Sequence, residues 1–241
     1  MLGALIPEQS AVVHAETPPA RGYNKAFMSA QIPDWADQAE HAVLDAALPR
    51  AADLGWTARL VQAAAAQAGL SAGEAQLLLP GGPRDLAALL SRRHDAAGLA
   101  ALSAIDPAGL KMRERIRAGV QARIEAAMAD AGALHRWAGF LALPGNLPLA
   151  LRLTWESADH IWRWAGDTAT DENHYSKRAI LSGILASTLA LRLTSGDEAA
   201  RAHLAARIDN VMAFEKWKAG IKTPLQFADV ATALGRMRYG R

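Results

Sequence analysis

Helix signals follow one another along almost the whole chain, and signals for β-strands are almost absent. Ala and Leu dominate, and the residues between the apolar stretches are mostly of the types that cap or interrupt helices. This pattern predicts an all-α protein of about ten helices. With 51% hydrophobic and 21% charged residues, the 241-residue chain has the composition of a soluble globular protein with ample material for a core.

The caps and breaks divide the chain into segments. The first expected helix runs from about Trp35 to Asp53 and is bent at Pro49. The starts or breaks that follow lie at Thr57, Ser71, Gly82-Pro83, Asp106-Pro107, Gly132, Pro144 to Pro148, Thr170 or Asp171, Ser195-Gly196-Asp197, and Thr223-Pro224. We expect a flexible leader at 1–33, a three-helix head at 34–82, a larger helical body at 83–220 and a C-terminal helix at 221–241.

The head contains a turn that is typical of a helix-turn-helix. The sequence Ala68-Gly69-Leu70-Ser71 lies between two short helices, after Leu54-Gly55-Trp56-Thr57, and resembles the head of TetR-type regulators. A recognition helix needs side chains that reach phosphates and base edges, but this segment offers Glu74 and a run of leucines. We therefore expect a structural helix-turn-helix that binds no nucleic acid. A ligand-responsive transcription regulator of TetR type is the alternative.

No arrangement of residues typical of a catalytic or metal centre is present. The chain has no cysteine, its histidines are scattered, and the Glu-x-x-His pairs of a ferritin-like di-iron site are missing. There is also no Gly-rich phosphate loop and no Gly-x-Ser-x-Gly. We predict a protein that is not an enzyme and that has no catalytic residue, no metal site and no cofactor.

The C-terminal segment is basic and amphipathic. Between Lys216 and Arg241 there are six basic residues against one acid, Asp229. A basic helix with an apolar stripe is typical of a helix that lies at a membrane surface. The predicted membrane contacts are Lys222, Leu225, Phe227, Leu234, Arg236, Met237 and Arg238. The alternative is a final helix that packs on its own body.

The segment from Asp159 to Ala179 carries the most specific pattern, Trp-x-x-Ala-Gly-Asp-x-x-Thr-Asp-x-Asn-x-Tyr-x-Lys-Arg-Ala. It resembles the signature of the coenzyme Q (ubiquinone) biosynthesis accessory family of the Coq-nine type, within the TetR-fold superfamily. The resemblance implies a dimeric protein that binds an isoprenoid lipid or quinone intermediate. It also implies that the protein presents this lipid to the demethoxyubiquinone hydroxylase at a membrane surface. Arg163 and His174 depart from the aromatic residues that are frequent in the family at these positions.

The resemblance places the hydroxylase-binding surface around Asp159 and Trp162, which lie one helical turn apart. A Trp flanked by carboxylates suits a protein contact, although a core position for any one Trp is an equal alternative. The predicted partner-binding residues are Asp159, Trp162, Arg163, Trp164, Asp167, Tyr175, Lys177 and Arg178.

The remaining apolar stripes of the body are assigned to a lipid tunnel or to a dimer interface. The predicted lipid-binding residues are Leu143, Leu147, Leu151, Trp155, Ile180 and Ile184. The stripe around Ile180 and Ile184 also suits a four-helix bundle between two copies. For location we expect the bacterial cytoplasm with peripheral contact to the inner membrane, or the matrix side of the membrane in a mitochondrion.

Overall fold

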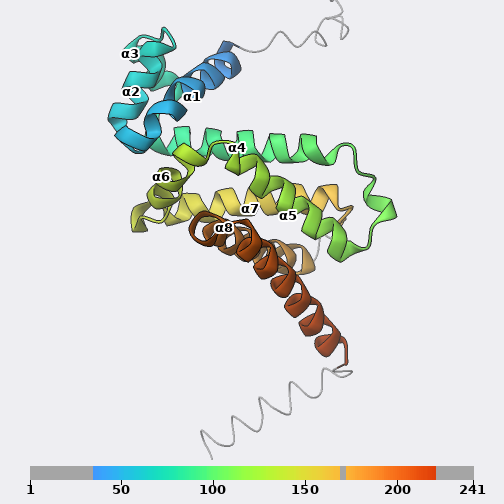
Figure 1. Cartoon of the computed structure of the whole chain (residues 1–241). Coiled ribbons are helices and arrows are strands. Elements are labelled where there is room, and N and C mark those ends of the chain that lie inside the picture. The colour runs from blue at the N-terminus through green and yellow to red at the C-terminus, as the bar shows by residue number, and fades with distance from the viewer. Residues whose placement is uncertain (1–34, 169–171, 221–241) are drawn as a thin grey trace, which may run out of the picture. The chain divides into compact units, whose positions relative to one another are not determined.

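The structure is a computed structural model of the whole chain, in which residues 35–168 and 172–220 are described (Figure 1). The described residues form eight α-helices and no strand, so the predicted all-α class is confirmed, with fewer helices than the ten expected. The helices are α1 (Trp35–Leu54), α2 (Ala58–Gln67), α3 (Ala72–Leu78), α4 (Pro83–Leu102), α5 (Met112–Met128), α6 (Ala131–Leu141), α7 (Leu147–Trp164) and α8 (Glu172–Gly220). The predicted leader, the cap at Thr170 or Asp171 and the C-terminal helix lie outside the described residues.

Helices α1, α2 and α3 form the predicted three-helix head. The Thr57 hydroxyl accepts a hydrogen bond from Leu60 N at 3.3 Å and begins α2. Ser71 begins α3 through a capping box with Glu74. The buried Trp56 donates from Nε1 to Ala133 O at 3.4 Å, which ties the α1–α2 turn to α6. Both predicted caps are therefore confirmed.

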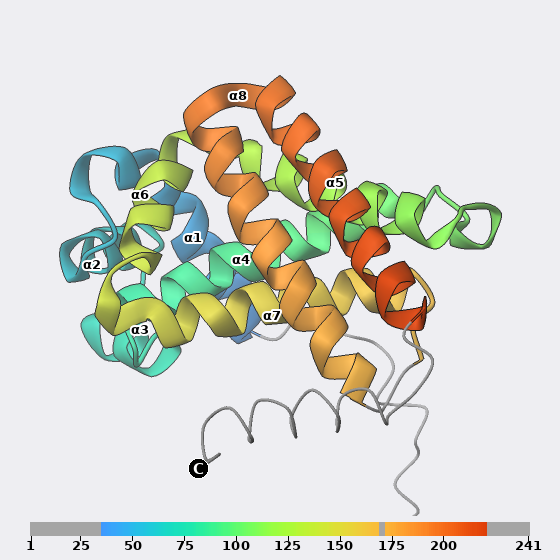
Figure 2. The same cartoon turned by 90° about the horizontal axis from the view of Figure 1, so that it is seen from below.

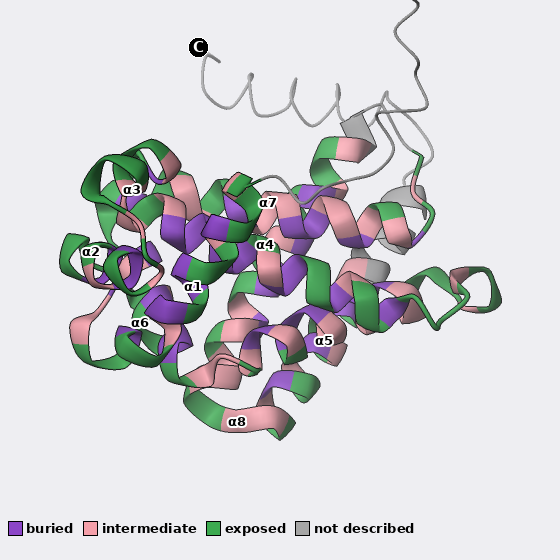
Figure 3. Cartoon of the chain, turned by 90° about the horizontal axis from the view of Figure 1, so that it is seen from above, coloured by how far each residue is buried: buried purple, intermediate pink, exposed green. Residues whose placement is uncertain are grey.

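The body is built from α4, α5, α7 and α8. Figures 1 and 2 show α4, α5 and α7 together at the centre, with α8 across them. One apolar cluster joins the head to α4, α6 and the start of α7, and a second joins α5, α7 and α8. Figure 3 shows that the buried positions lie on the facing sides of these helices. Helix α7 contributes to both clusters, so it connects the two halves of the core.

Helix α8 is two helical arms joined at Gly196, where φ is +85°. A positive φ of this kind is readily adopted only by glycine, and the break predicted at Ser195-Gly196-Asp197 is confirmed. His203 Nε2 and Ser187 Oγ lie 2.9 Å apart and link the two arms. By length and composition, His174–Val211 could cross a membrane. Its large apolar side chains are mostly buried or half-buried within the chain, and the exposed ones that are described are Tyr175 and Ile180.

Two predicted helix boundaries are wrong. Asp106-Pro107 opens a short 3-10 helix, Pro107–Gly109, because Asp106 Oδ1 accepts from Ala108 N at 2.9 Å; α5 begins only at Met112. Gly132 lies inside the first turn of α6. The break falls at Ala129 and Asp130, where the Asp130 carbonyl accepts from Ala133 N and Leu134 N and so starts the new helix.

Candidate functional site

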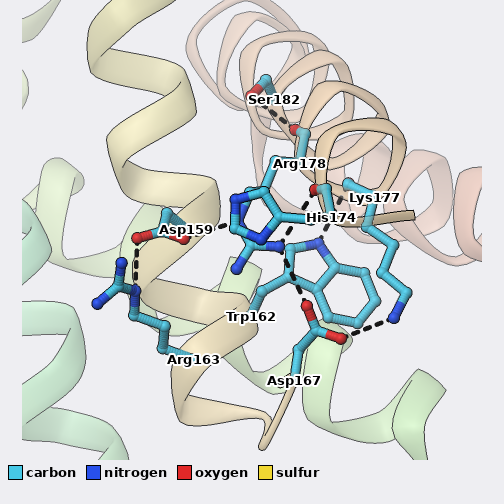
Figure 4. A network of polar contacts seen from close by, with 8 residues as sticks. All are labelled: Asp159, Trp162, Arg163, Asp167, His174, Lys177, Arg178 and Ser182. Carbon is cyan, nitrogen blue, oxygen red and sulfur yellow. Dashed lines mark hydrogen bonds and ion pairs between the residues drawn. The ribbon is translucent and has the colours of Figure 1, made fainter. Parts of the chain in front are cut away.

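The predicted partner-binding segment is held together by the buried side chain of Arg178 (Figure 4). Arg178 is on α8 and its side chain is 2% exposed. Its Nε donates to Asp159 Oδ1 at 2.6 Å, and its Nη1 donates to Asp167 Oδ2 at 3.0 Å. Because Asp159 is on α7 and Asp167 lies just after it, this one guanidinium fastens α8 to the end of α7.

Two further cations belong to this network. Arg163 Nε contacts Asp159 Oδ2 at 2.6 Å, and Lys177 Nζ contacts Asp167 Oδ1 at 2.6 Å. Each carboxylate thus lies between two positive groups. Asp167 thus pairs with both Lys177 and Arg178, which lie 10 and 11 positions further along the chain.

The two carboxyl groups remain ionised at neutral pH. Burial alone would raise the pKa of Asp159, but the hydrogen bond from Arg178 and the charges of Arg163 and Arg178 outweigh it and hold the pKa below its usual value. Burial opposes ionisation of Asp167 in the same way, and hydrogen bonds from Lys177 and Arg178 lower its pKa overall. Both carboxylates are therefore available to accept the hydrogen bonds of the network at neutral pH.

Trp162 is anchored by both ends of its indole. Its Nε1 donates to Lys177 O at 3.1 Å, and Lys177 Nζ lies 5.3 Å from the centre of the ring. The ring is half-buried and packs against the second apolar cluster. Trp164 is half-buried as well, so both tryptophans mix a core role with a surface role.

The predicted partner-binding residues separate into two layers. Arg163 and Tyr175 are the outermost, with 71% of the Arg163 side chain and 65% of Tyr175 exposed. Tyr175 also packs its ring 6.2 Å from that of Trp155. Arg178 lies beneath the surface, where its burial leaves it no room to contact another protein. Its role is to position the residues above it.

A separate apolar cavity of about 290 Å³ lies in the body between α4, α5, α6, α7 and α8. It opens near Ala142, Leu147, Ala186 and Ala190, which are exposed. This volume is close to the lower end of the roughly 300–1,000 Å³ typical of small-molecule pockets. Its lining is Ser91, Arg123, Ile124, Trp137, Ala138, Leu141, Ala142, Leu147, Ala150, Leu153, Thr154, Ser157, Leu185, Ala186, Leu189, Ala190 and Leu193.

The structure brings only one of the six predicted lipid-binding residues into this cavity. Leu147 lines it, whereas Leu143 and Leu151 are exposed and lie outside its lining. Trp155 is half-buried beside Tyr175. Ile180 and Ile184 line a smaller apolar pocket of about 70 Å³ with Trp162 and Lys177. On α7 the cavity is lined by Ala150 and Thr154, each one position before a residue predicted from the sequence, Leu151 or Trp155.

Sequence reasoning missed three polar residues that line the cavity, Ser91, Arg123 and Ser157, and Asp95, which binds Arg123 and Ser157 behind its wall. Ser91 and Asp95 are on α4, Arg123 is on α5 and Ser157 is on α7, and all four are buried. Arg123 Nε donates to Asp95 Oδ1 at 2.5 Å. A signal was available, because Arg123 interrupts the buried apolar stripe of α5, where an unpaired charge would be costly.

In the helix-turn-helix head, the side chain of Glu74 accepts from Ser71 N at 2.8 Å. This carboxylate serves the cap of α3, while Leu77 is 83% exposed on the same short helix. Nothing in this helix supplies a basic group for phosphate contacts.

Among the described residues no group of three or more His, Cys, Asp or Glu is placed to hold a metal ion. The predicted membrane contacts, Lys222 to Arg238, lie outside the described residues.

The fold and the site define an all-helical protein with a helix-turn-helix head and a body that holds an apolar cavity beside a charged surface network. Residues 147–215 of this chain match the COQ9 family model. The family resemblance seen in the sequence is confirmed over this segment. The matched segment begins at α7 and includes both the Arg178 network and the α7 and α8 walls of the cavity.

Comparison with curated proteins agrees with the match to the COQ9 family model. The chain is 29% identical over 208 residues to ubiquinone biosynthesis protein COQ9-B, mitochondrial, of Xenopus laevis, covering 76% of this chain and 68% of that protein. It is 28% identical over 195 residues to the Rattus norvegicus COQ9 protein, covering 76% and 62%. Against the Homo sapiens COQ9 protein it is 28% identical over 160 residues, covering 63% and 50%. The chain thus spans between half and about two thirds of the length of these relatives.

Proposed function

We propose that this protein is a lipid-binding accessory protein of ubiquinone biosynthesis, and that it acts by binding rather than by catalysis. It binds an isoprenoid quinone intermediate and presents it to the demethoxyubiquinone hydroxylase. The observation that carries this proposal is the apolar cavity, whose α7 and α8 walls fall inside the segment that matches the COQ9 family model. The names of its relatives, ubiquinone biosynthesis proteins, support the pathway.

The surface over the Arg178 network is the proposed contact with the hydroxylase. Exposed Arg163 and Tyr175 project from a base that buried ion pairs make rigid. A rigid surface loses little conformational freedom on binding, which favours affinity. Trp162 and Trp164 supply the aromatic area that is typical of contact centres.

We propose that α8 associates with a second copy and that the basic C-terminal segment is the membrane contact. Ala179, Gly183, Ala186 and Ala190 are exposed at helical spacing on α8, and such small residues leave room for another helix to pack closely. Because its relatives are mitochondrial proteins, we propose a peripheral position on the inner membrane, facing the mitochondrial matrix or, in a bacterium, the cytoplasm.

The proposal is tested by reconstituting the demethoxyubiquinone hydroxylase with lipid vesicles that contain demethoxyubiquinone. Adding this protein should raise the rate of hydroxylation, and a variant with Leu225, Phe227 and Leu234 changed to Ser should raise it less because it binds the vesicles weakly. An unchanged rate, together with no binding to the hydroxylase, would contradict the proposal. Retention on a DNA fragment with a steep salt dependence would instead support a transcription regulator.

A further inference from the structure

The apolar cavity has one polar end. Ser91, Arg123 and Ser157 line it, while most of the remaining lining side chains are Ala, Leu, Ile or Trp. These three come from α4, α5 and α7, so the polar end exists only in the folded protein. A buried cation on the wall of an apolar cavity is costly unless something compensates it.

Asp95 supplies that compensation and fixes the geometry. Its Oδ1 accepts from Arg123 Nε at 2.5 Å and from Ser157 Oγ at 2.6 Å. Arg123 Nη2 also donates to Ser91 Oγ at 3.3 Å. The guanidinium is therefore held on one side by two neighbours on α4 and cannot rotate freely.

The backbone spacing of α4 and α5 reinforces this position. Gly98 lies against Arg123, and a Cβ at Gly98 would lie 3.2 Å from Arg123 Cα, tighter than ordinary van der Waals contact. The absence of a side chain at Gly98 thus lets α5 approach α4 closely enough to bury the ion pair. The cation is built into the cavity wall by packing as well as by charge.

Arg123 has N–H groups for which the described residues supply no acceptor. A guanidinium carries five N–H groups, and described residues accept hydrogen bonds only from Nε and Nη2. Arg123 also lines the cavity, so its remaining N–H groups are the charged donors nearest to an acceptor oxygen held there. A hydrogen bond from a charged donor is about twice as strong as a neutral one, and more so away from water.

We infer that the Arg123 end of the cavity binds an acceptor oxygen on the headgroup of a lipid, such as a ring carbonyl or hydroxyl, while the apolar remainder holds the tail. This inference rests on the proposed function. Ser157 lies two residues before Asp159 on α7, about 3 Å along the helix axis. Ser157 is the α7 residue of the cavity lining nearest to Asp159 along the helix, so the headgroup lies at that end of the cavity, with the Arg178 network around the helix from it.

Equilibrium dialysis with two matched probes tests the inference. Geranyl-1,4-benzoquinone has acceptor oxygens on its ring, and geranylbenzene has the same tail without them. The wild-type protein should bind the quinone about tenfold or more tightly than the hydrocarbon, as expected for a hydrogen bond from a charged donor. The double variant Asp95→Leu/Arg123→Met replaces the whole ion pair by apolar groups, so it leaves no uncompensated charge. It should lose the preference and keep its affinity for geranylbenzene.

Leu147→Ala, at the apolar wall, is the matched control and should weaken both probes equally. If the double variant does not fold, Ser91→Ala decides, with an expected loss of about two- to tenfold for the quinone alone. Equal wild-type affinity for both probes, or an unchanged preference in the folded variants, would overturn the headgroup inference and leave the lipid proposal standing. Failure of the wild-type protein to bind either probe would overturn the lipid proposal itself.

Discussion

Arg178 on α8 donates to Asp159 on α7 at 2.6 Å from a position that is almost fully enclosed. The same guanidinium reaches Asp167, so a single buried side chain joins two helices and the turn after α7. Without Arg178, Asp159 would keep only Arg163 and Asp167 only Lys177, and each carboxylate would lose a hydrogen bond from the buried guanidinium. The surface above the network depends on this one residue for its shape.

We therefore expect Arg178→Met to lower the free energy of unfolding by roughly 2 kcal/mol or more, because two hydrogen bonds from a charged donor are lost. Arg178→Lys should also be destabilising, because an ammonium group does not reproduce the planar fork of donors that reaches both carboxylates. Arg163→Ala is the control, since its side chain is 71% exposed and such pairs contribute about 1 kcal/mol or less. Urea unfolding of the three variants measures this. Equal stability of Arg178→Met and Arg163→Ala would contradict the role given to Arg178.

The proposed hydroxylase contact predicts a difference between two exposed arginines on one helix. Arg163 and Arg152 are both on α7, are both mostly exposed and each pairs with an acid four residues away in the helix. Arg163→Glu should weaken binding to the hydroxylase by about tenfold or more, because it reverses a charge within the contact. Arg152→Glu should have little effect. Surface plasmon resonance gives both affinities, and equal losses would place the contact elsewhere.

The buried His94 predicts how stability depends on pH. Its side chain is 1% exposed, and burial and the charge of Arg123 lower its pKa to about 4 in spite of the contact with Asp130 at 2.9 Å. In the unfolded chain the pKa is near 6.5. Between these values the unfolded chain binds a proton that the folded protein does not, so stability falls as pH decreases from 6.5 toward 4, by up to roughly 3 kcal/mol.

His94→Leu should remove this part of the decline, and His41→Leu, at an exposed position, should retain it. Urea unfolding at a series of pH values between 7 and 4 provides the measurement. An identical decline in wild-type protein and His94→Leu would show that the pKa of His94 is not lowered by burial.

Local signals were enough to predict the parts of the fold that depend on neighbouring residues. Thr57 and Ser71 begin helices through their own hydroxyl groups, and Gly196 breaks α8 through its own backbone angle. The ion pairs of Asp167 with Lys177 and Arg178 can also be predicted from the sequence, because these residues lie close together along the chain.

Local sequence signals do not predict which residues line the cavity. The face of α7 that lines it carries Leu147, Ala150, Thr154 and Ser157, at helical spacing but with small and polar members. A search for large leucines selects Leu143 and Leu151 instead, which face solvent. Arg123 joins Asp95 from another helix, 28 positions away, and sequence spacing cannot reveal such a contact.

The central claim is that the cavity holds an isoprenoid lipid, and mass spectrometry of lipids extracted from the purified protein tests it most directly. The matched variants are Ala150→Phe, which fills the cavity from α7, and Ala202→Phe, at an exposed position on α8. Isoprenoid quinones or their precursors should accompany the wild-type protein and Ala202→Phe, and should be lost from Ala150→Phe. A wild-type protein without isoprenoid lipid, or an Ala150→Phe variant that carries as much as the wild type, would contradict the account.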